Sequence, residues 1–204
     1  MSILAIQPGA SYHIESLEAE RFSHYFDKIL RPEELDSVLL EKYSVLIVPC
    51  RTPAARMIPH KELLLSYLDK GGTIVATGES HSELWLPSVK FHEQDTNYWW
   101  WLEKDSDLGV SVAKPEHSLF KYIDKQALTW HLHGWFEVPD GVEVLAVNAE
   151  EKPILYIDEA TTNGQMVITS LDPFYHHGSR FMPSSTSFLD GFLPWVRDKL
   201  DVEN

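Results

Sequence analysis

Short, almost wholly apolar runs recur through the first 80 residues, and segments of helical length separate them. The runs cover residues 3–7, 27–30, 45–48 and 73–77. A strand that is buried on both faces loses the polar alternation of an exposed antiparallel strand, so these runs predict a parallel sheet. The segments at 17–25, 33–42 and 59–69 predict the helices that cover it. This alternation of strand and helix is typical of the α/β class.

The pattern breaks down between residues 84 and 136, where six of the seven tryptophans lie among prolines and histidines. We interpret 84–136 as an aromatic-rich insertion or cap over the sheet edge, within one domain that spans residues 1–204. Strands return at 143–148, 153–157 and 165–171, where we expect antiparallel neighbours, and a helix follows at 187–200. The predicted fold is an α/β domain with a mostly parallel central sheet.

Three consecutive tryptophans follow Tyr98, and aromatic faces bind sugars, flat rings and cations well. If this run is extended, Trp99 and Trp101 share one face while Trp100 takes the other. At least one ring would then border solvent, a cleft or a subunit. A cleft wall, an oligomer contact and core packing all stay open for this run.

Acidic residues outnumber basic ones by 31 to 17, which gives a net charge of -14. Such a surface repels nucleic-acid phosphates and anionic lipids unless a basic patch intervenes, and the sequence shows no such patch. Arg51 and Arg56 suit one small anion better than a polynucleotide. The expected partner is therefore a small-molecule ligand, with no nucleic acid and no membrane, and a homo-oligomer stays open.

The chain has a single cysteine, Cys50, which excludes an intramolecular disulfide and suits a reducing compartment. The N-terminal segment lacks a basic region, and its apolar run is too short for a signal sequence. No later run approaches the length of a membrane span. These features predict a cytoplasmic location.

Ligands of an open α/β sheet bind outside the carboxyl ends of its strands, so the residues that directly follow the strands are the candidates for a site. These segments supply a thiol, carboxylates, imidazoles and a guanidinium, a mixture that suits nucleophilic or acid–base chemistry. The candidates are Cys50, Arg51, Glu79, Ser80, His81, Asp172, His176 and His177.

Glu79 and Ser80 occupy the turn where a protein of this pattern normally places its nucleophile. Glu79 can serve as a general base or hold an amine or hydroxyl group of a ligand. The alternative is structural, because Ser80 can cap a following helix while Glu83 completes a capping box. Cys50 is a nucleophile only if a histidine and positive surroundings lower its pKa, and a lone cysteine after a buried strand is more often inert.

His131 and His133 stand two residues apart and share a face if their segment is extended, a spacing that is compatible with a metal. A third ligand could come from His176, His177 or Asp172. The sequence contains no spacing-defined metal motif, and hydrogen-bonded structural histidines are the alternative. We therefore predict no cofactor and assign no metal ligand, while a divalent metal at these histidines stays open.

Three stretches of the chain carry a family resemblance. They are Tyr-Ser-Val-Leu-Ile-Val-Pro at 43–49, Leu-Leu-Ser-Tyr-Leu-Asp-Lys-Gly-Gly-Thr-Ile-Val-Ala-Thr-Gly at 64–78, and Gly-Gln-Met-Val-Ile-Thr-Ser-Leu-Asp-Pro-Phe-Tyr-His-His-Gly at 164–178. Together they resemble the class I glutamine amidotransferase-like superfamily, and within it the ThuA-like proteins and the trimerisation domain of certain β-galactosidases. The resemblance implies a flavodoxin-like three-layer sandwich, and it leaves the aromatic middle unexplained.

The chain departs from that superfamily at the catalytic positions. In its glutaminases, a cysteine occupies the turn after the strand that matches 73–77, and a histidine and a glutamate follow a late strand. Here Gly78, Glu79 and Ser80 hold the cysteine's place, and the late ending reads Asp-Pro-Phe-Tyr-His-His at 172–177. The resemblance therefore implies a retained crevice without the thioester route.

Our sequence-based hypothesis is a domain that binds a small polar, carbohydrate-related ligand and is not a functional glutaminase. Its expected catalytic residues are Glu79 and His176, and its expected ligand-binding residues are Cys50, Arg51, Ser80, His81, His131, His133 and Asp172. One alternative is a non-catalytic oligomerisation or interaction domain. The other is a metal-dependent hydrolase that uses the histidines, and the sequence leaves open whether the protein is an enzyme.

Overall fold

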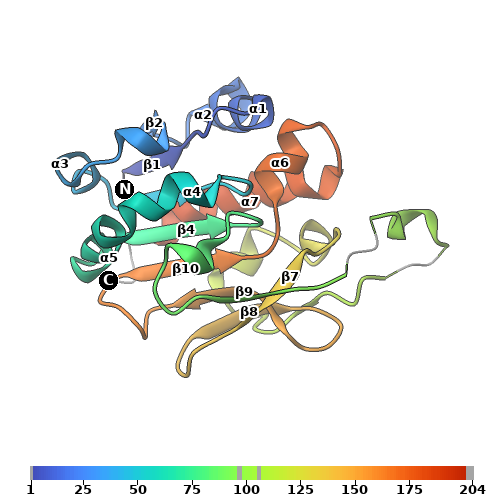
Figure 1. Cartoon of the computed structure of the whole chain (residues 1–204). Coiled ribbons are helices and arrows are strands. Elements are labelled where there is room, and N and C mark those ends of the chain that lie inside the picture. Colours follow the sequence, from blue (N-terminus) through green and yellow to red (C-terminus); the bar gives the residue numbers. More distant parts are fainter. Residues whose placement is uncertain (1, 96–97, 105–106, 201–204) are drawn as a thin grey trace.

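A single large sheet organises the molecule (Figure 1). The computed structural model describes residues 2–95, 98–104 and 107–200, and for Trp101 it describes the backbone alone. The sheet has eight strands in the order β2-β1-β3-β4-β10-β9-β8-β6. Neighbouring strands from β2 to β10 are parallel, whereas β9, β8 and β6 continue the sheet antiparallel. The predicted α/β fold with a mostly parallel central sheet is confirmed.

The parallel strands are the apolar runs that the sequence indicates. Their bounds are β1 (Ile3–Ile6), β2 (Lys28–Leu30), β3 (Val45–Val48), β4 (Thr73–Thr77) and β10 (Gln165–Thr169). The antiparallel strands are β6 (Ser111–Val112), β8 (Glu143–Val147) and β9 (Pro153–Asp158). The predicted antiparallel neighbours therefore exist, and the last of them, β10, also pairs with β4 in parallel and joins the two parts of the sheet.

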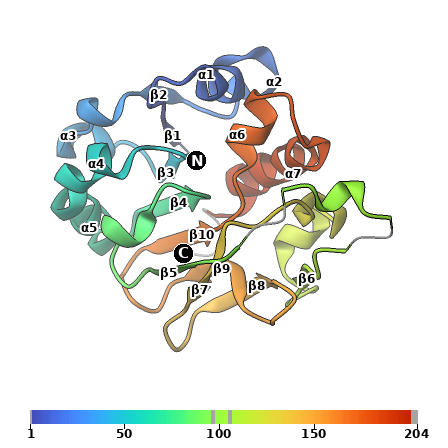
Figure 2. The ribbon, with the colours of Figure 1, turned by 45° about the vertical axis from the view of Figure 1, so that its right-hand side comes forward.

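Helices cover both faces of the sheet and make a three-layer sandwich, which Figure 2 shows with the sheet between them. One face carries α1 (Ser11–Glu18), α2 (Glu20–Ser23), α6 (Pro173–Gly178) and α7 (Pro183–Lys199). The other carries α3 (Ser37–Leu40), α4 (Ala54–Met57) and α5 (Lys61–Asp69). Among the helices that the structure describes, none is both long enough and apolar enough to cross a bilayer.

Two hydrophobic cores lie on opposite sides of the sheet, because successive side chains of a strand point to opposite faces. In β1, Ile3 and Ala5 belong to the core beneath α1, α6 and α7, while Leu4 and Ile6 belong to the core beneath α3 and α5. All four side chains are fully buried. This double burial explains why the strands read as continuous apolar runs.

The aromatic middle packs around the antiparallel end of the sheet. A separate two-stranded sheet pairs β5 (Lys90–Glu93) with β7 (Gly134–Glu137), and β6 becomes the edge strand of the main sheet. Trp85 and Phe136 pack into the core beneath α3 and α5, whereas Trp130 packs into the opposite core. The segment 84–136 therefore contributes side chains to both faces.

Three helix boundaries differ from the sequence-based expectation. The helix expected at 17–25 begins earlier, at Ser11, and the chain is extended at Ala19 before α2. The helix expected at 33–42 is a 3₁₀ turn followed by α3, which starts where the Asp36 carboxylate accepts a hydrogen bond from the Leu39 amide at 2.8 Å. The terminal helix begins at Pro183 instead of 187, with Pro194 inside it.

Candidate functional site

The carboxyl ends of β3, β4 and β10 lie side by side, because these strands pair in parallel and in register. The turn after β3 contains Cys50 and Arg51, the turn after β4 contains Glu79, and Asp172 follows β10 directly before α6. The Gly78 amide donates a hydrogen bond to the Thr169 carbonyl at 2.7 Å, which joins two of the turns. The sheet thus brings the strand-end candidates to one edge, as its topology requires.

Gly78 allows the three turns to approach closely. A Cβ atom at this position would lie 2.6 Å from the Cβ of Asp172 and 2.6 Å from that of Cys50, far inside van der Waals contact. Its φ of +52° is also in the left-handed region, which favours glycine. The absence of a side chain at Gly78 is therefore a condition for the geometry of the site.

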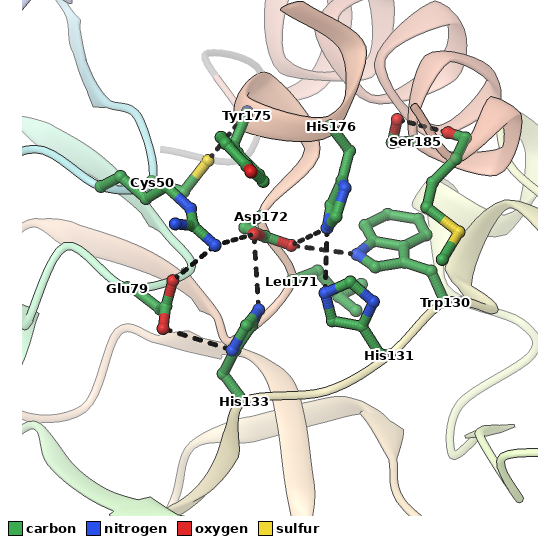
Figure 3. Close-up of polar contacts among 12 residues, drawn as sticks. Cys50, Glu79, Trp130, His131, His133, Leu171, Asp172, Tyr175, His176 and Ser185 are labelled. Atoms are coloured by element: carbon green, nitrogen blue, oxygen red, sulfur yellow. Dashed lines mark hydrogen bonds and ion pairs between the residues drawn. The ribbon is translucent and has the colours of Figure 1, made fainter. Parts of the chain in front are cut away.

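Charged groups from the three turns form a connected network (Figure 3). The Arg51 guanidinium lies 3.0 Å from the Glu79 carboxylate and 3.6 Å from that of Asp172. The other Glu79 oxygen lies 3.2 Å from His133 Nδ1, and His133 Nε2 lies 3.5 Å from Asp172 Oδ2. The Arg51 guanidinium also stacks over the Tyr175 ring, 3.7 Å from its centroid. Glu79 and Arg51 are about one-third exposed, whereas Asp172 is fully buried.

Behind this network lies a group of four buried residues that we call the His–Asp cluster: His131, His133, Asp172 and His176. His176 Nε2 is 3.0 Å from Asp172 Oδ1 and 3.1 Å from His131 Nε2. One potential ligand atom from each of the four residues lies within 4.8 Å of the others. Figure 3 shows the His131 and His176 rings meeting through their ring nitrogens beside the Asp172 carboxylate, and the two rings are nearly perpendicular.

The surroundings set the protonation of this cluster. Burial alone would raise the pKa of Asp172, but the close contacts and charge of His133 and His176 outweigh it and hold that pKa below its ordinary value. Burial lowers the pKa of His131 to about 4, against a smaller opposing effect of the Asp172 charge. The cluster therefore holds an ionised carboxylate beside a neutral His131 imidazole at neutral pH.

Cys50 lies in the interior instead of presenting its thiol to a ligand. Its side chain is fully buried, and its Sγ accepts a hydrogen bond from the Tyr175 amide at 3.2 Å. Burial, with the nearby Asp172 charge, raises the pKa of the thiol. His13 Nε2 lies 2.8 Å from the Cys50 carbonyl oxygen and so bonds the backbone, not the sulfur. The thiol thus lacks the lowered pKa that a nucleophilic cysteine needs.

Ser80 does not form the expected helix cap. A 3₁₀ helix follows at Ser82–Leu84, and the residue that precedes it is His81, in a left-handed conformation with φ of 49°. The capping-box interpretation of Ser80 and Glu83 is therefore wrong, because the turn continues for one more residue after Ser80. Ser80 is fully buried, and its hydroxyl has no hydrogen-bond partner in the part of the chain that the structure describes. His81 Nδ1 lies 3.2 Å from a Glu83 carboxylate oxygen.

A cavity of about 540 Å³, which we call the strand-end cavity, opens beside the network. It is lined by Glu79, His81, Phe91, Glu93, Gln94, Asp95, Tyr98 and His133. Of the predicted site residues, Glu79, His81 and His133 reach this cavity. Arg51, Asp172, His131 and His176 lie behind its wall, connected to it through the network, and Cys50 and Ser80 are buried outside the lining.

Sequence reasoning missed several residues of the site. Tyr98 lines the cavity and places its ring 5.0 Å from the ring of His131. Trp130 donates its indole N–H to Asp172 Oδ1 at 3.3 Å. The sequence did offer a signal for both residues: Tyr98 begins the tryptophan run, and Trp130 directly precedes His131. Glu93 and Asp95 gave none, because the pairing of β5 with β7 brings them to the cavity.

A second cavity of about 530 Å³, which we call the helical cavity, lies between α1, α2, α6 and α7. It is lined by Glu15, Arg21, His177, Arg180, Phe181, Met182, Pro183, Thr186, Ser187 and Asp190. His177 Nδ1 lies 2.8 Å from the Thr186 hydroxyl, so His177 does not join the His–Asp cluster.

No family model and no curated protein sequence matches the chain. Solved structures do. A ThuA-like protein from Bacteroides uniformis aligns with a TM-score of 0.57 and 15% identity, covering 100% of this chain and 93% of that one. A GMP synthase component from Thermoplasma acidophilum aligns with a TM-score of 0.62 and 12% identity over 100% of this chain and 97% of that one.

A β-galactosidase from Bacillus circulans aligns with a TM-score of 0.50 and 15% identity. The alignment covers 95% of this chain and 30% of the β-galactosidase, so the likeness concerns one part of that enzyme. All three identities are low, and the likeness therefore concerns the fold. The chain has the class I glutamine amidotransferase-like, ThuA-like fold that its sequence resembles.

Proposed function

We propose that the protein binds a small polar ligand in the strand-end cavity, with the Glu79 carboxylate as its main contact, and that it does not hydrolyse glutamine. The main observation that supports this proposal is the position of Glu79. It lines the cavity at the carboxyl end of β4, is about one-third exposed, and is held by Arg51 on one oxygen and His133 on the other. A preorganised carboxylate at this edge of an α/β sheet is well placed to contact a ligand.

Two observations speak against a glutaminase. The turn after β4 has no cysteine, since Gly78, Glu79 and Ser80 stand there. The chain's one thiol, Cys50, is fully buried and has a raised pKa, so it cannot supply a thiolate for a thioester. The fold is that of an amidotransferase-like domain, but this chain offers no nucleophile for the glutaminase reaction.

The lining of the cavity favours a neutral or cationic ligand. Glu79, Glu93 and Asp95 place three carboxylates in the wall, and no lysine or arginine is among the lining residues that the structure describes. Anions would be repelled, whereas hydroxyl and ammonium groups can donate hydrogen bonds to the carboxylates. Tyr98 adds an aromatic ring, a good platform for a sugar face. Because a β-galactosidase is among the similar structures, carbohydrates and amino sugars are the first ligands to screen.

The two expected catalytic residues occupy different positions relative to the cavity. Glu79 faces it and can accept a proton from a bound ligand. His176 is almost fully buried and touches Asp172 and His131 instead of the cavity. We therefore propose that Glu79 contacts the ligand and that His176 acts only within the His–Asp cluster.

Thermal-shift screening with monosaccharides, amino sugars and polyols tests this function. A ligand at 100 times its dissociation constant stabilises the folded protein by about 2.7 kcal/mol, a readily measured rise in Tm. Glu79→Gln keeps the shape of the side chain but removes its charge, and it should abolish the shift. Glu15→Gln is the matched control, because Glu15 lines the helical cavity, and it should leave the shift intact. A shift that survives Glu79→Gln, or that disappears with Glu15→Gln, would contradict the proposal.

An oligomerisation role is a second candidate, supported by apolar side chains at the protein surface. Trp99 and Leu102 are each 64% exposed, which is unusual for large apolar side chains. Light scattering of the wild-type chain and of Leu102→Gln tests this role. A dimer or trimer that dissociates in the variant supports it, and a monomeric wild-type protein rejects it.

A further inference from the structure

We propose that the His–Asp cluster binds one Zn²⁺ ion behind the His133 side of the strand-end cavity, with His131, His133, His176 and Asp172 as ligands. The ion's effect on ligand binding rests on the proposed function, whereas binding of the ion stands by itself. Three features of the cluster carry the inference: its hydrogen bonding, its distances and the groups that hold it.

The contacts of His176 Nε2 are crowded for a single hydrogen-bonding atom. This nitrogen lies 3.0 Å from Asp172 Oδ1 and 3.1 Å from His131 Nε2. In a neutral imidazole it carries either one proton or one lone pair, so one N–H must be shared between the two neighbours as a bifurcated hydrogen bond. A cation between the three atoms would replace that shared bond by a direct contact to each of them.

Further polar atoms of the cluster are buried without a hydrogen-bond partner. His133 Nε2 and Asp172 Oδ2 lie 3.5 Å apart, yet neither makes a hydrogen bond within the described residues. The side chains of Asp172 and His133 are 0% and 6% exposed. Buried polar atoms in native proteins are nearly always satisfied, and a buried set of such atoms that converges on one point indicates a ligand between them.

The distances fit a tetrahedral ion. With ligand bonds of about 2.0–2.1 Å, neighbouring ligand atoms of a tetrahedral zinc site lie about 3.3 Å apart. Two separations are close to this value: 3.0 Å from His176 Nε2 to Asp172 Oδ1 and 3.1 Å from His176 Nε2 to His131 Nε2. His133 Nε2 lies 3.5 Å from the other Asp172 oxygen, Oδ2, and one ligand atom from each residue lies within 4.8 Å of the rest. Small rotations of the rings therefore suffice to bring four ligands to one ion.

One of the three imidazoles, His133, has the kind of partner that usually orients a metal ligand. Glu79 Oε1 lies 3.2 Å from His133 Nδ1, which directs Nε2 of the same ring at the cluster. Trp130 donates its indole N–H to Asp172 Oδ1. Arg51 offsets one of the two carboxylate charges of Glu79 and Asp172, so the neighbourhood keeps a negative charge that favours a cation.

The ligand types favour zinc over the hard cations. Three imidazoles and one carboxylate suit Zn²⁺, whereas Mg²⁺ requires oxygen ligands and water. The ion would lie behind His133, next to the cavity in which Glu79 faces the ligand. With four protein ligands the site is closed, so the ion would fix the orientation of the His133 ring in the cavity wall.

Isothermal titration of the full-length chain with ZnCl₂, after chelator treatment and without any organic ligand, tests the site. We expect about one Zn²⁺ per chain and no binding of MgCl₂. His131→Asn and Asp172→Asn remove proposed ligands and should abolish the zinc isotherm. Glu79→Gln should weaken zinc affinity by about 10–100-fold, the usual effect of losing a group that orients a metal ligand.

His177→Asn is the matched control, because His177 follows His176 in sequence but bonds Thr186 outside the cluster. It should bind zinc like the wild type. Circular dichroism checks that each variant is folded. If a variant of a buried ligand unfolds, the zinc affinity of Glu79→Gln still tests the site, because Glu79 is partly exposed. Absence of zinc binding by the wild type, or unchanged affinity in His131→Asn and Glu79→Gln, overturns the proposal. Zinc binding without any ligand-induced thermal shift would overturn the proposed function alone.

Discussion

The two cavities of this protein have nearly the same volume, about 540 and 530 Å³, yet their polar groups are arranged differently. In the helical cavity, Arg21 pairs with Asp190 at 2.7 Å and Arg180 pairs with Glu15 at 3.2 Å, largely in contact with solvent. In the strand-end cavity, Glu79 leads through His133 to the buried Asp172. Volume therefore does not distinguish the two cavities, whereas the buried polar groups that converge behind the strand-end cavity without hydrogen-bond partners among the described residues do.

Asp172→Ala should have the largest effect on stability. It leaves the indole N–H of Trp130 and the His176 ring without their acceptor and removes a partner of Arg51. Removing one partner from a buried ionic network costs about 3–5 kcal/mol. Urea unfolding of chelator-treated protein measures this loss. A cost below about 1 kcal/mol, the range of exposed pairs, would show that the two cavities do not differ as described.

Gly78→Ala should have the next largest effect, because it tests the close approach of the three turns. The added Cβ would overlap Asp172 and Cys50, and such overpacking costs about 1–3 kcal/mol. The left-handed conformation adds about 1–2 kcal/mol. Urea unfolding and the zinc isotherm should both report a loss.

Gly71→Ala is the matched control for this steric effect. Gly71 also has a positive φ, +87°, but no atom lies within 4 Å of its added Cβ. It should therefore cost only the conformational part, about 1–2 kcal/mol, and leave zinc binding intact. Equal costs for the two variants would mean that close approach at Gly78 does not shape the site.

Asp190→Ala, a change in the helical cavity, should have the smallest effect on stability. Its partner Arg21 is 55% exposed, and exposed ion pairs contribute about 0–1 kcal/mol. We expect a change of Tm close to the error of the measurement, and no change in zinc affinity or ligand-induced shift. A loss of stability as large as that of Asp172→Ala would contradict the difference between the two cavities.

The sequence predicted the parts of the molecule that depend on local pattern. Apolar runs gave the parallel strands, and the rule for ligands at strand ends led to Glu79 and Asp172, which the topology brings together. The spacing of His131 and His133 also indicated a shared location, and of the three further candidates the structure brings His176 and Asp172 to it, not His177.

Features that depend on tertiary packing could not be predicted. The burial of Cys50 follows from α6, whose Tyr175 amide covers its sulfur. Ser80 reads as a helix cap, but the residue before the next helix is His81. Tyr98 and Glu93 reach the cavity only because β5 pairs with β7 far along the chain. The aromatic segment has no periodicity that places these side chains.

Anomalous X-ray diffraction at the zinc edge, from crystals of the chain grown with ZnCl₂, tests whether the His–Asp cluster binds the ion. We expect one strong peak bounded by His131, His133, His176 and Asp172, about 2 Å from the nearest nitrogen atoms. Ordered crystals with zinc peaks at surface carboxylates and none within the His–Asp cluster would contradict it.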